Sequence, residues 1–283
     1  MTAGLAAAVA TAVGLGVLSG VGREPEATTA PRPTQATTHA LATTSDSTSD
    51  KPLAGKVVVI DPGHQLGNSR FPSKINRLVD AGGFKKPCNT TGTSTNSGYA
   101  EATFNFKVAK VVQRRLKKLG ATVVMTRKAN RYDRWGPCVD FRGRLGNKLK
   151  KQQLGADKSR AGTRADLKLS IHGDGSAAGN RGFHIIVSTH KTGHRATSKA
   201  YAKRTRAALW DAGFKRSTYI GGGTALSFRG DLATLNLSRI PAVMVELGNM
   251  RNAKDAKQMT SAKGQRKYGR ALVRAIRAQL EHG

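Results

Sequence analysis

Three short apolar segments of this sequence each lead into a side chain that can bind a metal ion or carry a proton. The run at residues 57–60 is followed by His64, a second run ends at His172, and a third ends at Glu246. Short β-branched runs bounded by Gly or Pro are typical of buried strands. Ligands of open α/β sheets bind just beyond the carboxyl ends of such strands. Two imidazoles and a carboxylate at one sheet edge therefore indicate a metal-assisted active site.

Glutamate is rare in the part of the chain that carries these segments. After the first 50 residues there are 46 Lys and Arg against 13 Asp and Glu, and the only glutamates are Glu101, Glu246 and Glu281. Glu246 ends an apolar strand, where an unpaired carboxylate is costly to bury. Glu101 begins a helical pattern and falls on the same apolar face as Phe104. Glu101 and Glu246 therefore occupy apolar positions, where a carboxylate without a function is not expected. Glu281 needs no functional explanation.

Three ligands and one open position are the usual composition of a catalytic zinc site, and two His with one Glu are among the known sets. His64, Glu101 and His172 match that set. Asp174 is a candidate acceptor that orients the His172 imidazole, although helix capping or turn formation explains it equally well.

Simpler interpretations remain open for individual residues. A His after a Pro-Gly turn, such as His64, is often a hydrogen-bonding turn residue. Glu246 has an alternative as a buried carboxylate paired with Arg229 or Arg239. The combination of residues, not any single one, favours the metal site.

The arrangement of apolar patterns predicts the elements that position these side chains. Helical periodicity and Gly120 as a C-cap mark the first long helix. Because strands alternate with helices, we expect an α/β fold: one domain with a twisted, mostly parallel or mixed sheet and helices on both faces. Expected strands are 57–60, 122–126, 167–172, 183–188 and 242–246; expected helices are 100–119, 138–154, 198–211 and 261–280; and 65–98 and 220–238 are expected to be irregular.

Four segments, in this order, resemble the signature blocks of the zinc-dependent N-acetylmuramoyl-L-alanine amidases (peptidoglycan amidases, type 3). They are Val-Ile-Asp-Pro-Gly-His64, Ser-Gly-Tyr-Ala-Glu101, Leu-Ser-Ile-His172-Gly-Asp and Pro-Ala-Val-Met-Val-Glu246-Leu-Gly-Asn. The resemblance implies that His64, Glu101 and His172 bind Zn²⁺ and that Glu246 is the catalytic carboxylate. It also implies hydrolysis of the amide between N-acetylmuramic acid and the L-alanine of the peptidoglycan stem peptide. Gly173, where the family more often has Ala, is a small departure.

Two other functions fit parts of the pattern. A zinc peptidase would use the same ligands to cut within the stem peptide, and a catalytically weak cell-wall-binding protein would use mainly the basic surface. The charge alone also suggests nucleic acid, but aromatics are only 5% of residues, so stacking platforms for bases are scarce. We expect a monomer with a peptidoglycan or muropeptide substrate, anionic cell-wall polymers as partners and no specific nucleic acid. The basic stretch 148–164 is expected to be a surface loop that holds such polymers.

The N-terminal region has the composition of an export segment and a spacer. Residues 3–21 are almost wholly Ala, Val, Leu and Gly, as in a signal peptide, with a membrane anchor as the alternative. The expected domains are a signal peptide or anchor at 1–22, a disordered Thr/Ser/Pro-rich linker at 23–52 and a catalytic domain at 53–283. This organisation predicts a secreted, cell-wall-associated protein.

Cys88 and Cys138 are the only cysteines. An even number in an exported chain predicts one disulfide, with two free buried thiols as the alternative.

Overall fold

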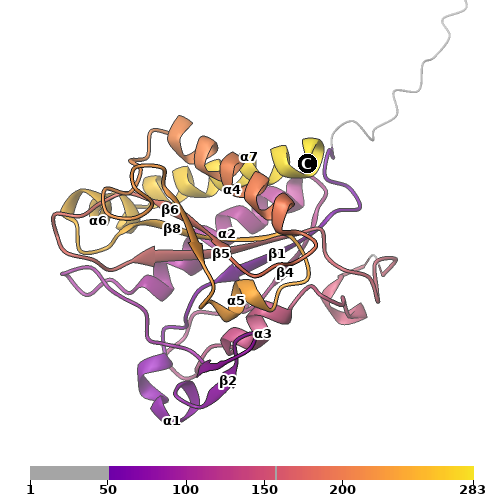
Figure 1. Cartoon of the computed structure of the whole chain (residues 1–283), viewed down its shortest axis with the longest axis horizontal. Helices are drawn as coiled ribbons and strands as arrows, with labels where there is room; N and C mark the ends of the chain where they lie inside the picture. Colours follow the sequence, from indigo (N-terminus) through magenta and orange to yellow (C-terminus); the bar gives the residue numbers. More distant parts are fainter. Residues whose placement is uncertain (1–50, 157) are drawn as a thin grey trace, which may run out of the picture. The chain divides into compact units, whose positions relative to one another are not determined.

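The computed structural model describes residues 51–156 and 158–283, so the expected signal segment and most of the expected linker lie outside the described residues. A six-stranded sheet in the order β4-β1-β5-β8-β6-β7 forms the centre of the fold (Figure 1). β4, β1, β5 and β8 run parallel, whereas β6 is antiparallel to β8 and parallel to β7. The described helices do not include one that is long and apolar enough to cross a bilayer. The strands are β1 (Val57–Pro62), β4 (Thr122–Met125), β5 (Leu167–Asp174), β6 (His184–Ser188), β7 (Leu226–Arg229) and β8 (Ala242–Asn249), and a separate hairpin pairs β2 (Leu78–Asp80) with β3 (Lys85–Pro87).

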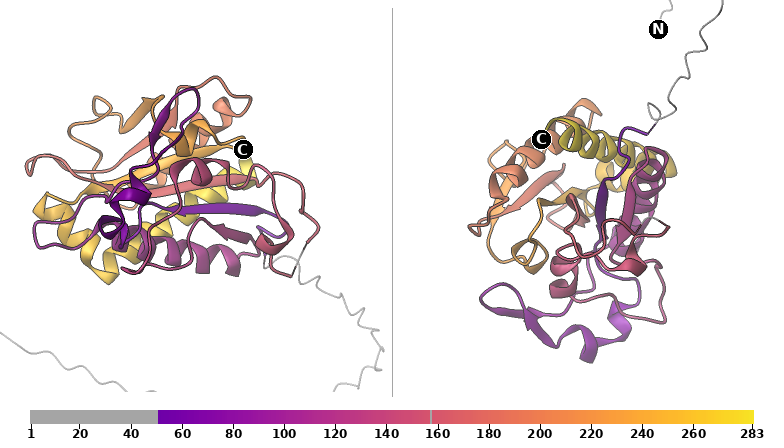
Figure 2. Two further views of the ribbon diagram at one scale, coloured as in Figure 1. Left: turned by 90° about the horizontal axis from the view of Figure 1, so that it is seen from below. Right: turned by 90° about the vertical axis from the view of Figure 1, so that its right-hand side faces the viewer.

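Helices cover both faces of the sheet, as the sequence predicts. Three long helices, α2, α4 and α7, lie on one face, and α7 packs against both of the others (Figure 1 and the right-hand view of Figure 2). They enclose the main core, in which Phe214 and Tyr268 stack with ring centroids 3.9 Å apart. The short helices α3 and α5 lie at the other face, whereas α6 packs against α7 beside the main core. The helices are α1 (Pro72–Ile75), α2 (Glu101–Lys118), α3 (Val139–Arg144), α4 (Arg195–Asp211), α5 (Ala233–Asn236), α6 (Ala253–Thr260) and α7 (Ala262–His282).

The two faces of the central strands differ in polarity. Successive side chains of a strand point to opposite faces. On β5, Leu169 and Ile171 belong to the main core, so Ser170 and His172 face the other way. The same alternation on β8 places Val245 in the core and Glu246 on the face that carries His172. Strands that read as continuous apolar runs therefore still present polar groups to one side.

Three segments contain short elements that the sequence did not predict. Residues 65–98 contain α1 and the β2–β3 hairpin, and 220–238 contain the edge strand β7 and the helix α5. A further helix, α6, precedes α7. These elements are three to eight residues long, too short for hydrophobic periodicity to define them.

The expected helix at 138–154 is also wrong, because α3 ends at Arg144. Gly146 has φ of 93°, a left-handed conformation, and a Cβ there would lie 2.7 Å from the Cγ2 of Val59. A residue with a side chain would be strained and would collide with the core. The chain therefore turns at this position and forms only a short 3₁₀ helix at Lys151–Gln153.

The predicted disulfide joins Cys88 to Cys138. Cys138 is the N-cap of α3, and the amide of Val139 donates to the carbonyl of Cys88 at 2.7 Å. The link fixes the end of the β2–β3 hairpin against the start of α3, beside the site described below.

Candidate active site

His64, Glu101 and His172 converge on one point at the carboxyl ends of β1 and β5. His64 Nε2 lies 3.2 Å from Glu101 Oε2, and His172 Nδ1 lies 3.0 Å from Glu101 Oε1. One nitrogen or oxygen from each of the three residues lies within 4.8 Å of the others. The structure thus brings His64 and His172, which are more than 100 positions apart in the chain, to the same carboxylate.

Backbone geometry fixes the orientation of His64. This residue follows β1 with φ of 56°, and its Nδ1 lies 3.0 Å from the carbonyl oxygen of Thr90. When Nδ1–H donates a hydrogen bond to that carbonyl, Nε2 carries no proton. Its lone pair is then available to a metal ion on the side that faces Glu101. Metal-ligating histidines commonly hold their second ring nitrogen in this way.

Glu101 begins α2 and its side chain is 3% exposed. Its carboxylate accepts hydrogen bonds from Thr93 N at 2.9 Å, Asn105 Nδ2 at 3.0 Å and Gly173 N at 3.2 Å. Burial alone would raise the pKa of Glu101, but the adjacent histidines His64 and His172 outweigh it and hold the pKa well below its usual range. The group is therefore an anion at neutral pH.

The chemistry of this donor set fits a divalent cation. The buried carboxylate supplies one negative charge and an oxygen ligand. The two imidazoles supply nitrogen ligands of intermediate softness, a combination that suits zinc. Gly92 leaves room for this cluster, because a Cβ there would lie 2.7 Å from Glu101 Oε2 and 2.9 Å from the ring of His64.

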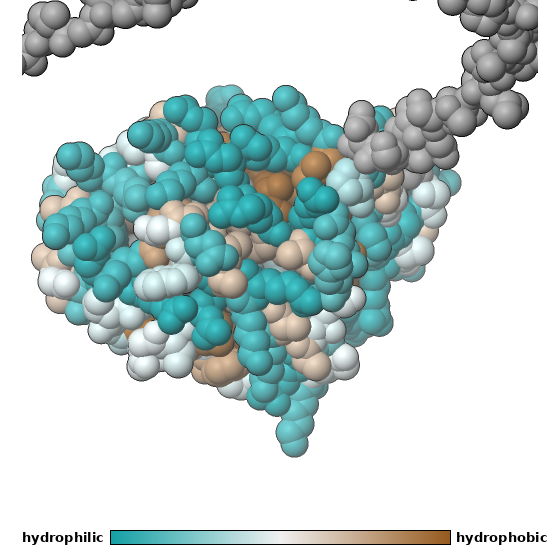
Figure 3. All heavy atoms as spheres, turned by 90° about the horizontal axis from the view of Figure 1, so that it is seen from above, coloured by the Kyte–Doolittle hydropathy of each residue, from teal (hydrophilic) through white to brown (hydrophobic). Residues whose placement is uncertain are grey.

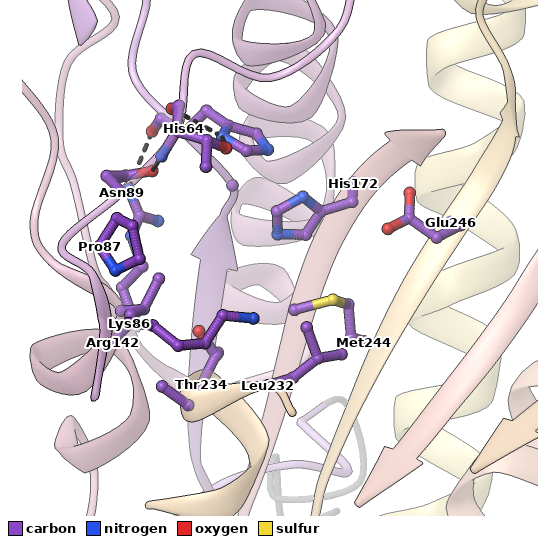
Figure 4. Close-up of a pocket in the computed structure, with 14 residues that line it drawn as sticks. His64, Lys86, Pro87, Asn89, Arg142, His172, Leu232, Thr234, Met244 and Glu246 are labelled. Atoms are coloured by element: carbon purple, nitrogen blue, oxygen red, sulfur yellow. Dashed lines mark hydrogen bonds between the residues drawn. The ribbon is translucent and has the colours of Figure 1, made fainter. Parts of the chain in front are cut away.

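Glu246 lies beside this cluster on β8, directly across from His172 in the strand register. Figure 4 shows both side chains extending from neighbouring strands into the same space. The alternative pairing with Arg229 is not formed, since that guanidinium donates to both carboxylate oxygens of Asp231 at 2.8 and 2.7 Å. Burial, with the negative charges of Glu101 and Asp174, raises the pKa of Glu246 well above its usual range.

Two hollows adjoin this cluster. One is a cavity of about 230 Å³, lined by apolar side chains that include Val139, Leu232 and Met244 (Figure 4). The other is shallower and more polar, with Thr93 and Arg251 in its wall. His64, His172 and Glu246 line both hollows, so the two hollows meet at the cluster.

Comparison with known proteins identifies the family. Residues 58–278 match the family described as N-acetylmuramoyl-L-alanine amidase. The chain belongs to this family. It is 37% identical over 227 residues to the N-acetylmuramoyl-L-alanine amidase Rv3717 of Mycobacterium tuberculosis, covering 79% of this chain and 86% of that protein.

Two crystal structures of mycobacterial N-acetylmuramyl-L-alanine amidases share the fold. Ami1 of Mycobacterium smegmatis superposes with a TM-score of 0.72 and 36% identity, over 82% of this chain and 99% of that one. The apo form of Ami1 from Mycobacterium abscessus gives a TM-score of 0.71 and 39% identity, over 81% of this chain and 100% of that one. The α/β fold predicted from the sequence is therefore the amidase fold.

A buried ion pair underlies the site of this amidase-family chain and was not predicted from the sequence. Arg142 Nη1 donates to Asp61 Oδ1 at 2.5 Å, and Asp61 also accepts from Thr126 and Ser170, each at 2.6 Å. Arg142 Nη2 donates to the carbonyl of His64 at 2.9 Å. Arg142 thus ties a strand-end carboxylate to the backbone of a candidate ligand.

Asp174 does not orient His172. Its Oδ2 accepts from the Tyr219 hydroxyl at 2.7 Å and its Oδ1 from Gly175 N at 2.7 Å. The Tyr219 contact is a feature that only the structure reveals.

Proposed function

We propose that this protein is a zinc-dependent hydrolase that cleaves the amide between N-acetylmuramic acid and L-alanine of peptidoglycan. Membership of the amidase family supports peptidoglycan amidase activity. The observation that carries the zinc assignment is the convergence of His64, Glu101 and His172 beside the free carboxylate of Glu246.

The geometry of the four residues supports one role for each. His64, Glu101 and His172 hold the metal, which when bound lowers the pKa of a water molecule and polarises a carbonyl oxygen. Glu246 accepts the proton of the attacking water and then delivers it to the departing L-alanine amine. A carboxyl group with a raised pKa is a stronger base than an ordinary glutamate, which suits the acceptance of a proton from water.

The two hollows provide room for both sides of the scissile amide. A peptidase that cuts within the stem peptide would use the same metal site, so the products decide between the two reactions. Mass spectrometry of digested peptidoglycan should find free lactyl carboxylate on muramic acid and a stem peptide with an L-alanine amino terminus. A new carboxylate within the stem peptide would instead identify a peptidase.

Glu101→Gln tests the metal assignment directly. Loss of the only anionic ligand should weaken zinc binding by more than about 100-fold, since even the partners of metal ligands contribute about 10–100-fold. A chelator competition titration measures the affinity. Glu281→Gln is the control, because Glu281 lies near the C-terminus and pairs with Arg277. Equal zinc affinity in the parent and Glu101→Gln would contradict the assignment.

We also propose that the 148–164 loop binds anionic cell-wall polymers and retains the protein at the wall, outside the cytoplasm. Arg160 donates to the carbonyl of Gly55, which precedes β1, and to Asp166, which precedes β5. The loop therefore lies at the amino ends of these strands, opposite the edge that carries His172. Polymer bound there would leave the active site open.

Replacing Lys148, Lys150 and Lys151, all exposed, by Gln should release the protein from isolated cell walls at lower salt. Arg114, Lys117 and Lys118 on α2 are exposed and allow a control with the same change of charge. This control matters because hydrophilic side chains are spread over the surface, as Figure 3 shows for the face that carries α4 and α7. A cosedimentation assay across a salt series compares the two variants. Equal release of both would mean that net charge, and not this loop, determines retention.

A further inference from the structure

Glu246 lies between two histidines on neighbouring strands. The register places Glu246 of β8 opposite His172 of β5 on one side and opposite His184 of β6 on the other. Directly opposed residues point to the same face, with Cβ atoms about 4.5–5.5 Å apart in an antiparallel pair. His172, Glu246 and His184 therefore form a row across three strands, and only His172 belongs to the candidate metal site.

Two buried atoms in this row have no hydrogen-bond partner among the described residues. They are Nδ1 of His184 and Oε2 of Glu246. Buried polar atoms in folded proteins nearly always have a partner, and one buried water molecule typically serves about three of them. The two atoms come from directly opposed residues on the same sheet face, so a single water molecule can satisfy both.

The surroundings of His184 fix the ring and keep it neutral. The side chain is 3% exposed, and the Tyr219 ring packs edge-on against it with centroids 6.1 Å apart. Burial lowers the pKa of His184 to about 4, against the attraction of Asp174. The Tyr219 hydroxyl donates to Asp174 and makes no hydrogen bond with Nδ1 of His184.

We propose that His184 is a positioning residue whose Nδ1–H holds Oε2 of Glu246 through one shared water molecule. The other carboxylate oxygen is then left to accept the proton of the attacking water and to pass it to the leaving amine. His184 itself gains and loses no proton in this scheme. The inference rests on the proposed role of Glu246 as the proton carrier.

Two variants of the full chain separate this role from simple packing. His184→Asn keeps an N–H near the position of Nδ1, whereas His184→Leu keeps only apolar bulk. We expect His184→Leu to lower kcat by about tenfold or more with little change in KM, and His184→Asn to stay within about threefold of the parent. His190→Leu serves as the control for loss of a histidine outside the row. Thermal unfolding and zinc stoichiometry of each variant are measured in parallel.

The outcomes that overturn the proposal are clear. If the kcat of His184→Leu stays within about twofold of the parent, His184 has no role in catalysis. If the Asn and Leu variants lose kcat equally, His184 contributes only through packing. If instead the parent releases no L-alanine stem peptide from peptidoglycan, the proposed function fails, which is a different result.

A second readout does not depend on turnover. Protein labelled with ¹⁵N-histidine reports the ring nitrogens of His184 by NMR. Glu246→Gln should shift the His184 ring signals and leave those of His190 unchanged, because the shared hydrogen bond changes its acceptor. Unchanged His184 signals would overturn the proposal.

Discussion

Replacing Glu246 by Gln should abolish amide hydrolysis while the protein still binds one zinc ion. The amide side chain has nearly the same shape as the carboxylate but cannot accept the proton of the attacking water. General acid–base groups contribute about 10²–10⁴-fold, so we expect kcat to fall by at least about 100-fold. Mass spectrometry of peptidoglycan digests measures the loss of product, and elemental analysis measures the metal.

The metal measurement makes this result specific. Glu246 lies across from His172 in the register and is not one of the three clustered ligands. Loss of zinc together with activity would assign Glu246 to the metal and contradict its proposed role. Glu281→Gln again provides a matched control, because it removes the same charge far along the sequence from any site residue.

Replacing Arg142 by Met should destabilise the protein by about 3–5 kcal/mol, because it leaves the Asp61 carboxylate buried without its partner. The side chains of Arg142 and Asp61 are 2% and 0% exposed. Arg142 and the hydroxyls of Ser170 and Thr126 hold the pKa of Asp61 far below its usual range although burial opposes this. Urea unfolding of the parent and the variant measures the difference in the free energy of unfolding.

Two controls identify the cause of that loss. Asp61→Asn combined with Arg142→Met removes the unpaired charge and should recover part of the stability. Arg144 pairs with Asp80 at the surface, where both side chains are about half exposed, so Arg144→Met should leave the urea midpoint nearly unchanged. A cost below about 1 kcal/mol for Arg142→Met would show that the buried pair is not needed for stability.

The sequence was sufficient to find the four candidate site residues. His64, His172 and Glu246 follow or end buried apolar runs, and Glu101 falls on the apolar face of a helix; each position is unusual for a polar group. The α/β class and the long helices could also be predicted, because period and length are local properties of the chain. The expected disulfide was also confirmed, and its pairing could be predicted because two cysteines allow only one.

The short elements could not be predicted, and neither could the groups that surround the site. The end of α3 depends on the close approach of Gly146 to Val59, a contact between distant segments.

The partners of the site residues were also decided by the tertiary structure. Arg142 is one of many basic residues in the sequence, and only its burial against Asp61 distinguishes it. His184 reads as an ordinary strand residue until the antiparallel register of β6 places it across from Glu246. Residue type and local pattern therefore determined which side chains can do the chemistry. Strand order and register determined which neighbouring groups position those side chains, because pairing across a sheet leaves no local pattern in the sequence.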